Sequence, residues 1–363
     1  RRKALVGLDH GELDFTEATR TEGTVTMRLR RILPVLCVPA LVLGACSSRD
    51  LVAPEVTSQP SSASPNLDSA RIERVLGSIQ DTINTADATR DAAALEPRLE
   101  GGALRMRSDQ YAAAKATNTE VPKLVVNQGS VAVTNSDQWP RVIVNVSSPD
   151  QASLPVLAFA VQDDARSKYK LVGWTRALGG AQFQLDNVEK GSAALGPDAQ
   201  GFVKTPKEAL QGYVDMLNSG NAGNDQYAGD DFARRYLQDA KSLNDAVQAA
   251  GNVQAHADLS ADFPIVGVEL VDGSALVAAS FTYTQTYQRT VARSTMRLGG
   301  TTAALAEGDD DTVKGKATAT YIVTVLLHIP KAGSDSQLIS AVGAERALGS
   351  VVKDDGAGNP DQR

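Results

Sequence analysis

The sequence predicts an α+β fold built as two domains, each with helices followed by an antiparallel sheet. Three observations lead to this fold class. Apolar residues recur at three- and four-residue steps in residues 67–83, which is typical of a helix with one buried face. Val- and Ile-rich runs separated by turn residues begin at residue 123. The same helix-then-strand order starts again at residue 205, and 363 residues exceed the usual size of one hydrophobic core.

The N-terminal segment has the features of an export signal. Residues 1–26 contain no methionine, and five acidic residues there would hinder translocation, so we interpret Met27 as the start and residues 1–26 as a non-native extension. An arginine-rich stretch after Met27 precedes an apolar run over residues 32–43, which is too short to span a bilayer permanently. Residues 27–45 are therefore predicted to be a cleaved signal peptide.

The signal ends in Leu43-Gly44-Ala45-Cys46, which resembles the lipobox of bacterial lipoproteins. This resemblance implies cleavage between Ala45 and Cys46 and attachment of a diacylglyceryl group to the sulfur of Cys46. Two or more acyl chains, such as palmitate, hold a protein stably on a membrane. The alternative is an ordinary signal peptide with an incidental cysteine. The expected location is extracytoplasmic, on the outer face of the cell membrane.

Residues 46–66 form the predicted link between this anchor and the folded protein. The segment contains the lipidated cysteine and is rich in Ser and Pro, so it buries little apolar area and is expected to act as a tether. The other cysteine, Cys37, lies within the signal, which leaves no thiol for disulfide, metal or nucleophilic chemistry after maturation.

The first predicted domain covers residues 67–180. Asn66 and Asp68 are candidate N-caps for its first helix, and an Ala-rich second helix follows Gly101-Gly102. The pattern then changes to strands separated by turn residues, which favours short antiparallel connections. These strands are expected at residues 124–134, 141–147, 154–162 and 169–178.

A bridge over residues 181–204 separates this unit from a second domain, residues 205–352. Thr205, Pro206 and Glu208 form a strong helix start, with an N-cap, a proline at N1 and an acid at N3. More helix is expected at residues 232–250, and a final apolar segment at 337–352 is either a strand or a helix. Further strands are expected at residues 265–270, 275–290 and 316–329. Residues 353–363 are predicted to be a disordered tail.

This repeated order resembles tandem NTF2-like or cystatin-like domains, in which helices pack into a curved antiparallel sheet. Together with the lipobox and an Ala-, Val-, Asp- and Gly-rich composition, it also resembles an actinobacterial family of lipoproteins of unknown function. The resemblance covers most of residues 67–352. It implies a fold and a location, and it brings no activity with it.

A candidate pocket lies on the strand at residues 275–290. Phe281, Tyr283 and Tyr287 share one face of this strand by the two-residue period of β structure, and Tyr283 offers a hydroxyl among apolar walls. The opposite face, with Ser280 and three threonines, is expected to face solvent. The competing interpretation is that the three aromatic rings simply fill a core.

Catalytic and metal-binding patterns give no sharp candidate. Asp215 or Asp231 could act as a base with Tyr213 or Tyr236 in an NTF2-like enzyme, but no spacing distinguishes them from solvated helix residues. Two acidic clusters, residues 221–231 and 307–311, lack the alternating ligands and glycine of an EF-hand loop. His256 and His328 have no cysteine or second histidine nearby. We therefore expect no cofactor and no metal.

The charge balance limits the class of partner. After residue 45, 29 basic and 38 acidic residues give a net charge of −9, with no basic run of the kind that nucleic-acid binding needs. We expect a non-enzymatic envelope protein that binds a small apolar ligand or a protein partner and contacts the membrane through its anchor. The alternatives are an isomerase- or hydrolase-like enzyme with an NTF2-type cavity, and a structural assembly subunit.

Overall fold

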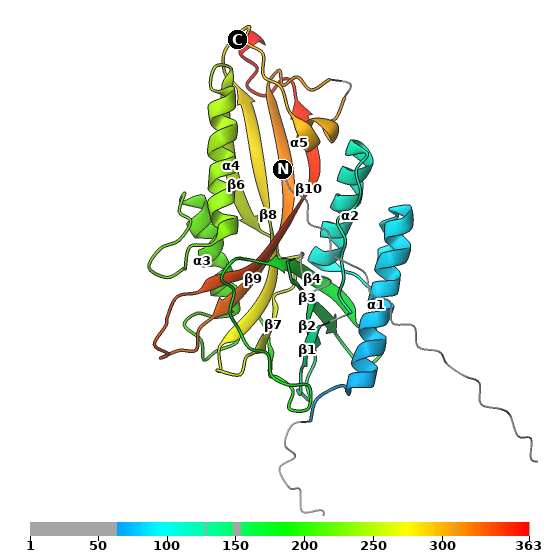
Figure 1. The fold of residues 1–363 in the computed structure, drawn as a ribbon. Coiled ribbons are helices and arrows are strands. Elements are labelled where there is room, and N and C mark those ends of the chain that lie inside the picture. Colours follow the sequence, from blue (N-terminus) through cyan, green and yellow to red (C-terminus); the bar gives the residue numbers. More distant parts are fainter. Residues whose placement is uncertain (1–63, 128, 148–153, 309, 363) are drawn as a thin grey trace, which may run out of the picture. The chain divides into compact units, whose positions relative to one another are not determined.

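One antiparallel sheet of ten strands runs through the described chain (Figure 1). The computed structural model describes residues 64–362, except residues 128, 148–153 and 309. The strands follow the order β1-β2-β3-β4-β10-β9-β8-β7-β5, and β6 pairs with β8 beyond the stretch that pairs with β7. The α+β class is therefore confirmed.

The first half of the described chain contains two helices and a four-stranded meander. Its elements are α1 (Ser69–Thr89), a 3-10 helix (Ala93–Leu95), α2 (Gly101–Thr117), β1 (Ser130–Val133), β2 (Arg141–Ser147), β3 (Val156–Gln162) and β4 (Lys170–Ala177). The antiparallel pairing of β1 to β4 matches the predicted short connections. The predicted strand at residues 124–134 is shorter: the backbone groups of Leu124 and Val126 bond to the Gln80 side chain of α1, and strand β1 begins at Ser130.

The second half repeats the order of helices before long strands. Its elements are β5 (Ala194–Leu195), α3 (Pro206–Asn218), α4 (Asp231–Val247), β6 (Gly251–Leu259), β7 (Val266–Glu269), β8 (Ala275–Arg289), α5 (Gly300–Ala304), β9 (Lys316–Ile329), β10 (Ser340–Asp354) and a 3-10 helix (Pro360–Gln362). The capping box of Thr205 and Glu208 is confirmed at the start of α3. The final apolar segment at residues 337–352, which was predicted to be either a strand or a helix, forms most of strand β10. Strand β6 and helix α5 were not predicted.

The two glycines before the second predicted helix are its first residues. Glycine is needed at Gly102 because a Cβ there would lie 2.1 Å from the hydroxyl oxygen of Ser280 on β8. Helix α2 therefore packs closely on the face of β8 that the sequence predicts to face solvent. Ser280 is buried and shares a hydrogen bond of 2.9 Å with Thr324 of β9. The expectation of a solvated face is wrong at Ser280, since helices cover both faces of this part of the sheet.

Three of the four hydrophobic cores in the described part of the chain pack the helices and strands of the two halves, and the fourth lies near α5, where it includes residues of β6, β8, β9 and β10. One lies between α1, α2 and one face of β1–β4, and another lies between α3, α4 and one face of β8 and β9. The third joins the two halves on the opposite faces of their strands, where Val142 and Phe159 of the first half pack with Val266, Leu276 and Leu326 of the second. All described residues belong to one compact unit, Ser58–Arg363. The division into domains at residues 181–204 stays a prediction, because a shared sheet does not show whether each half folds alone.

Helix α2 is tied to α1 by a buried arginine. Arg107 is fully buried, and its guanidinium binds both carboxylate oxygens of Asp87 while also donating to the Gln110 side chain and to the carbonyl oxygen of Pro122, each at 2.8 Å. The Tyr111 hydroxyl donates to the same aspartate at 2.6 Å. This network satisfies a buried charge, which would otherwise be strongly unfavourable.

Among the described strands, β6 pairs only with β8, and two helix side chains bind the β6 backbone. The side-chain amide of Asn218 donates to the carbonyl oxygen of Ala257 and accepts from its N–H, both at 2.8 Å. Asn244 accepts from the N–H of Val253 at 2.9 Å. These asparagines from α3 and α4 occupy backbone groups that another strand would need.

Candidate functional site

A tyrosine and arginine cluster lies where β8, β9, β10 and α4 meet. Arg346 of β10 donates one hydrogen bond to the Tyr283 hydroxyl and another to Asp239 of α4, both at 2.8 Å. Its guanidinium carbon lies 5.8 Å from the ring centroid of Tyr321. The bonds to β8 and α4 hold the Arg346 side chain at the centre of this surface.

The aromatic side chains pack in a defined order behind Arg346. Tyr283 and Tyr321 are cross-strand partners, and their rings are stacked with centroids 4.5 Å apart. The Tyr236 ring of α4 meets Tyr283 edge to face at 5.1 Å. Burial raises the pKa of Tyr283 and Tyr321 and raises the pKa of Tyr236 to about 12. All three phenols are therefore neutral at physiological pH.

Glu345 and Arg176 form a second polar centre beside the first. The two side chains form an ion pair between β10 and β4, and both are partly buried. Burial raises the pKa of Glu345, although the charge of Arg176 opposes this shift. The adjacent residues Glu345 and Arg346 thus provide opposite charges at the point where β10 leaves β4.

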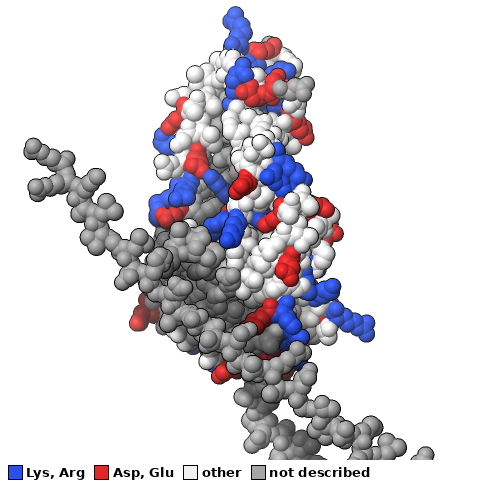
Figure 2. All heavy atoms as spheres, turned by 45° about the vertical axis from the view of Figure 1, so that its right-hand side comes forward, with Lys and Arg blue, Asp and Glu red and all other residues white. Residues whose placement is uncertain are grey.

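Three hollows share Arg346 in their lining, and we call them together the Arg346 groove. The basic hollow, about 550 Å³, lies between β4, β10 and the first turns of α4, from Asp231 to Arg235. The α2 hollow, about 410 Å³, lies between α2, α5 and β10. The α4 hollow, about 500 Å³, is lined by α4 residues 239–247 together with residues of β8, β9 and the segment around α5. Figure 2 shows basic and acidic side chains next to one another on the visible face of the molecule.

The predicted pocket residues lie on one face of β8, but they do not share one cavity. Phe281 and Tyr283 are fully buried in the core under α3 and α4, and Tyr287 is buried in a separate cluster near the end of β8. Tyr287 also lines the α4 hollow, and Tyr283 reaches the groove only through its bond to Arg346. The interpretation of these three residues as a pocket stays a prediction.

Apart from Asp231 and Tyr287, the residues that line the groove were missed from sequence. Arg346 and Glu345 were not singled out, and neither was Arg176, which is far away along the chain. One signal was available: Glu345 and Arg346 are the only charged residues in the apolar segment 337–352. Charged residues inside a strand that is otherwise uncharged indicate either a partner or a binding site.

The weaker sequence candidates have local roles. Asp230 caps α4 and accepts a hydrogen bond from Tyr213 at 3.0 Å, while Asp231 pairs with Arg234. In the acidic segment near residue 310, Asp310 pairs with Lys353 and Asp311 with Arg297. Within the described residues, no group of three or more His, Cys, Asp or Glu side chains is arranged to hold a metal ion.

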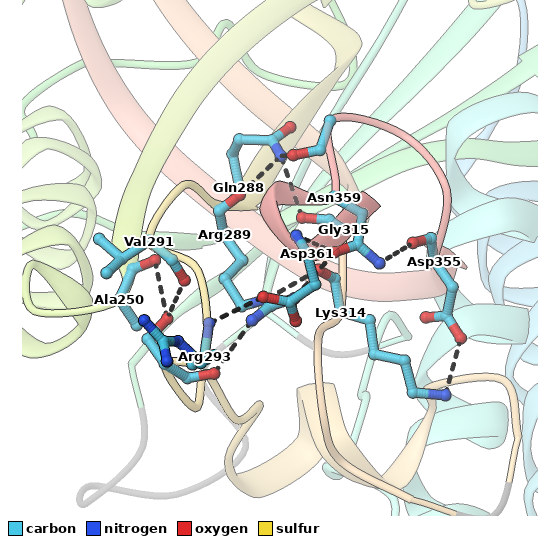
Figure 3. A network of polar contacts seen from close by, with 12 residues as sticks. Ala250, Gln288, Arg289, Val291, Arg293, Lys314, Gly315, Asp355, Asn359 and Asp361 are labelled. Atoms are coloured by element: carbon cyan, nitrogen blue, oxygen red, sulfur yellow. Dashed lines mark hydrogen bonds and ion pairs between the residues drawn. The ribbon is translucent and has the colours of Figure 1, made fainter. Parts of the chain in front are cut away.

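A second buried polar network holds residues 355–362, and we call it the C-terminal clasp (Figure 3). Arg289 at the end of β8 donates to the carbonyl oxygens of Lys314 and Ser294, at 2.7 and 3.1 Å, and to the side chains of Asn359 and Asp361. Gln288 adds bonds to the carbonyl oxygens of residues 315 and 357. The predicted disordered tail is thus wrong for residues 353–362: β10 continues to Asp354, and a 3-10 helix follows.

The predicted anchor lies outside the described residues. Ala45, Cys46, the signal at residues 27–45 and the upstream residues 1–26 belong to this part of the chain, as does most of the tether. Across residues 64–362, apart from the gaps, no helix is both long and apolar enough to cross a membrane.

Comparison with known proteins gives one family. A family model described as "Domain of unknown function (DUF8094)" matches residues 63–347, which include β1 to β9 and Arg346. The curated proteins gave no match, and the solved structures gave none.

Proposed function

The chain belongs to the family described as a domain of unknown function (DUF8094), which carries no assigned activity, and we propose that it is a non-enzymatic binding protein whose ligand occupies the Arg346 groove. The observation that carries this proposal is the meeting of three hollows at one fixed arginine. Their volumes lie in the range of ligand sites in proteins, which are concave surfaces with a few well-placed polar groups.

The groove offers a ligand both a charged guanidinium group and the surface of an aromatic ring. Arg346 is held by Tyr283 and Asp239, so it is already in place before a ligand arrives. The Tyr321 side chain lines both the α2 hollow and the α4 hollow beside it. A ligand that lies across Arg346 would therefore contact an aromatic ring and a charge at the same point.

The cell envelope is the proposed place of action. The support is the lipobox ending at Cys46 and the Ser- and Pro-rich segment after it. Changing Cys46→Ala is expected to abolish incorporation of labelled fatty acid and to release the protein from the membrane fraction. Continued labelling of this variant would contradict the anchor.

We also propose that the two halves correspond to tandem NTF2-like or cystatin-like units. In each half, two helices precede antiparallel strands and cover one face of them. In this arrangement the groove lies at the junction of the units, since Arg176 comes from the first half and Arg346 from the second.

The binding proposal is tested by filling the groove. Ala113 on α2 and Ala246 on α4 line different hollows, so Ala113→Trp and Ala246→Trp place a large side chain in each. Ala332→Trp, on an exposed loop, is the matched control. Native mass spectrometry of the full chain purified from its host membranes is expected to show a bound species in the wild type and the control. A third variant, Ala344→Trp, places the same side chain in the basic hollow. Retention of the bound species by all three groove variants, or its absence from the wild type, would contradict the proposal.

A further inference from the structure

The basic hollow has a local charge that differs from the rest of the protein. Its lining includes Arg176, Arg235 and Arg346 but only two acidic residues, Asp231 and Glu345. The whole chain, in contrast, has a net charge of −7. An excess of arginine in one concave site of an acidic protein favours an anionic ligand.

The three arginines differ in whether their guanidinium groups are already paired with an acid of the protein. Arg176 pairs with Glu345, and Arg346 pairs with Asp239. Arg235 is exposed and makes no hydrogen bond or ion pair with any described residue. The two acids four residues away from it on α4, Asp231 and Asp239, are already paired, with Arg234 at 2.5 Å and with Arg346 at 2.8 Å. Arg235 therefore has its donors available for a ligand.

The remaining wall of the basic hollow is apolar. Phe232 and Leu178 line it, together with the side chain of Leu154. Leu154 is 58% exposed, the largest exposed fraction among the large apolar side chains of the described chain. An apolar side chain that lies this open at the edge of a hollow is stabilised when a ligand covers it.

We propose that the basic hollow binds an anionic amphiphile: a carboxylate or phosphate head bonded by Arg235, and an acyl chain that covers Leu154, Leu178 and Phe232. This inference rests on the proposed function and names the class of ligand for one part of the groove. Guanidinium groups bind carboxylate and phosphate through paired, charge-assisted hydrogen bonds, so either head is accepted. The apolar wall distinguishes such a ligand from a free small anion.

The test is calorimetric titration of the full chain carrying Cys46→Ser, so that no acyl chain of its own competes. Dodecanoate and dodecyl phosphate represent the two sources of the anionic head, and 1-monolauroylglycerol is the neutral analogue with the same chain. We expect at least one anion to bind about tenfold or more tightly than the neutral analogue, and to bind more weakly at higher salt. Acetate and inorganic phosphate, which lack the chain, are expected to show no binding.

Two variants and a control assign the contacts. Arg235→Gln is expected to lower affinity for the anions about tenfold while leaving the neutral analogue unchanged. Leu154→Gln is expected to weaken binding of all three amphiphiles, the neutral one included. Arg71→Gln, an exposed arginine on α1 paired with Asp68, is expected to have no effect.

The outcomes separate this inference from the proposed function. Equal binding of anion and neutral analogue, unchanged anion affinity in Arg235→Gln, or no binding of any of the amphiphiles overturns the anionic-amphiphile assignment. A host-derived species that is lost in the tryptophan variants would still support a ligand in the groove. Absence of that species as well would overturn both.

Discussion

At the scale of single residues, burial determines what Tyr283 contributes. Its ring is fully buried and contacts Tyr236 and Tyr321, so truncation would leave an internal cavity. We expect Tyr283→Ala to lower the free energy of unfolding by about 3–5 kcal/mol. Tyr283→Phe keeps the ring and loses only the bond to Arg346, so about 0.5–1.5 kcal/mol is expected. Urea titrations measure both, and a similar small loss in the two variants would indicate that the ring borders open space.

His328 makes the stability depend on pH. Its imidazole nitrogen lies 2.9 Å from the Ser274 hydroxyl, and burial lowers the pKa of His328 while the charge of Asp272 opposes the shift. The unfolded chain therefore binds the proton more readily, and stability decreases as the pH falls through about 6.5, the ordinary histidine pKa. Thermal melts between pH 5 and 8 should show this decrease in wild type and in His256→Gln, whose histidine is exposed, but not in His328→Gln.

At the scale of elements, the C-terminal clasp connects residues 355–362 to the ends of β8 and β9. The buried guanidinium of Arg289 satisfies two backbone carbonyls and two side chains there. In Arg289→Leu each buried carbonyl that loses its donor costs about 1–3 kcal/mol, so the melting temperature should fall and residues 355–362 should become sensitive to protease. Lys314→Met removes only the exposed pair with Asp355 and should leave both properties unchanged. Protection of residues 355–362 in Arg289→Leu would contradict the clasp.

Elements with a strong local signal could be predicted from sequence. The α3 start at Thr205 and the strand at residues 141–147 agree with the structure, because a capping box and a Val/Ile run between turns each act within a few residues. Strand β6 was missed because only two of its nine residues, Val253 and Ala257, are buried; the others are exposed or half-buried. Its stability comes from pairing with β8 and from Asn218 and Asn244, which no local pattern shows.

The Arg346 groove could not be predicted for the same reason. It joins Arg176, Arg235 and Arg346, which come from β4, α4 and β10 and meet only through the sheet order. Sequence reasoning found the aromatic alternation on β8, including Tyr283, because that signal has a period of two residues. It could not show that the Tyr283 hydroxyl turns toward an arginine on another strand.

At the scale of the whole molecule, the core between the two halves decides whether they fold separately. The sequence predicts independent domains, but Val142 and Phe159 are buried against strands of the second half. Separation would expose these apolar faces to water. We therefore expect residues 67–180 and 205–352, expressed alone, to lack a cooperative thermal transition that the full chain shows in calorimetry. Two separate cooperative transitions would instead confirm independent domains.

The position of β10 also determines when this protein is able to reach its folded state. β10 lies between β4 and β9 in the sheet, yet its residues 340–354 follow all the other strands in the sequence. During synthesis the ribosome must therefore release about fifteen residues beyond residue 339 before β4 and β9 can be joined in one sheet. Until β10 has been synthesised, the sheet lacks the strand that lies between β4 and β9. For the export that we propose, this order keeps the sheet incomplete until the last strand has been synthesised.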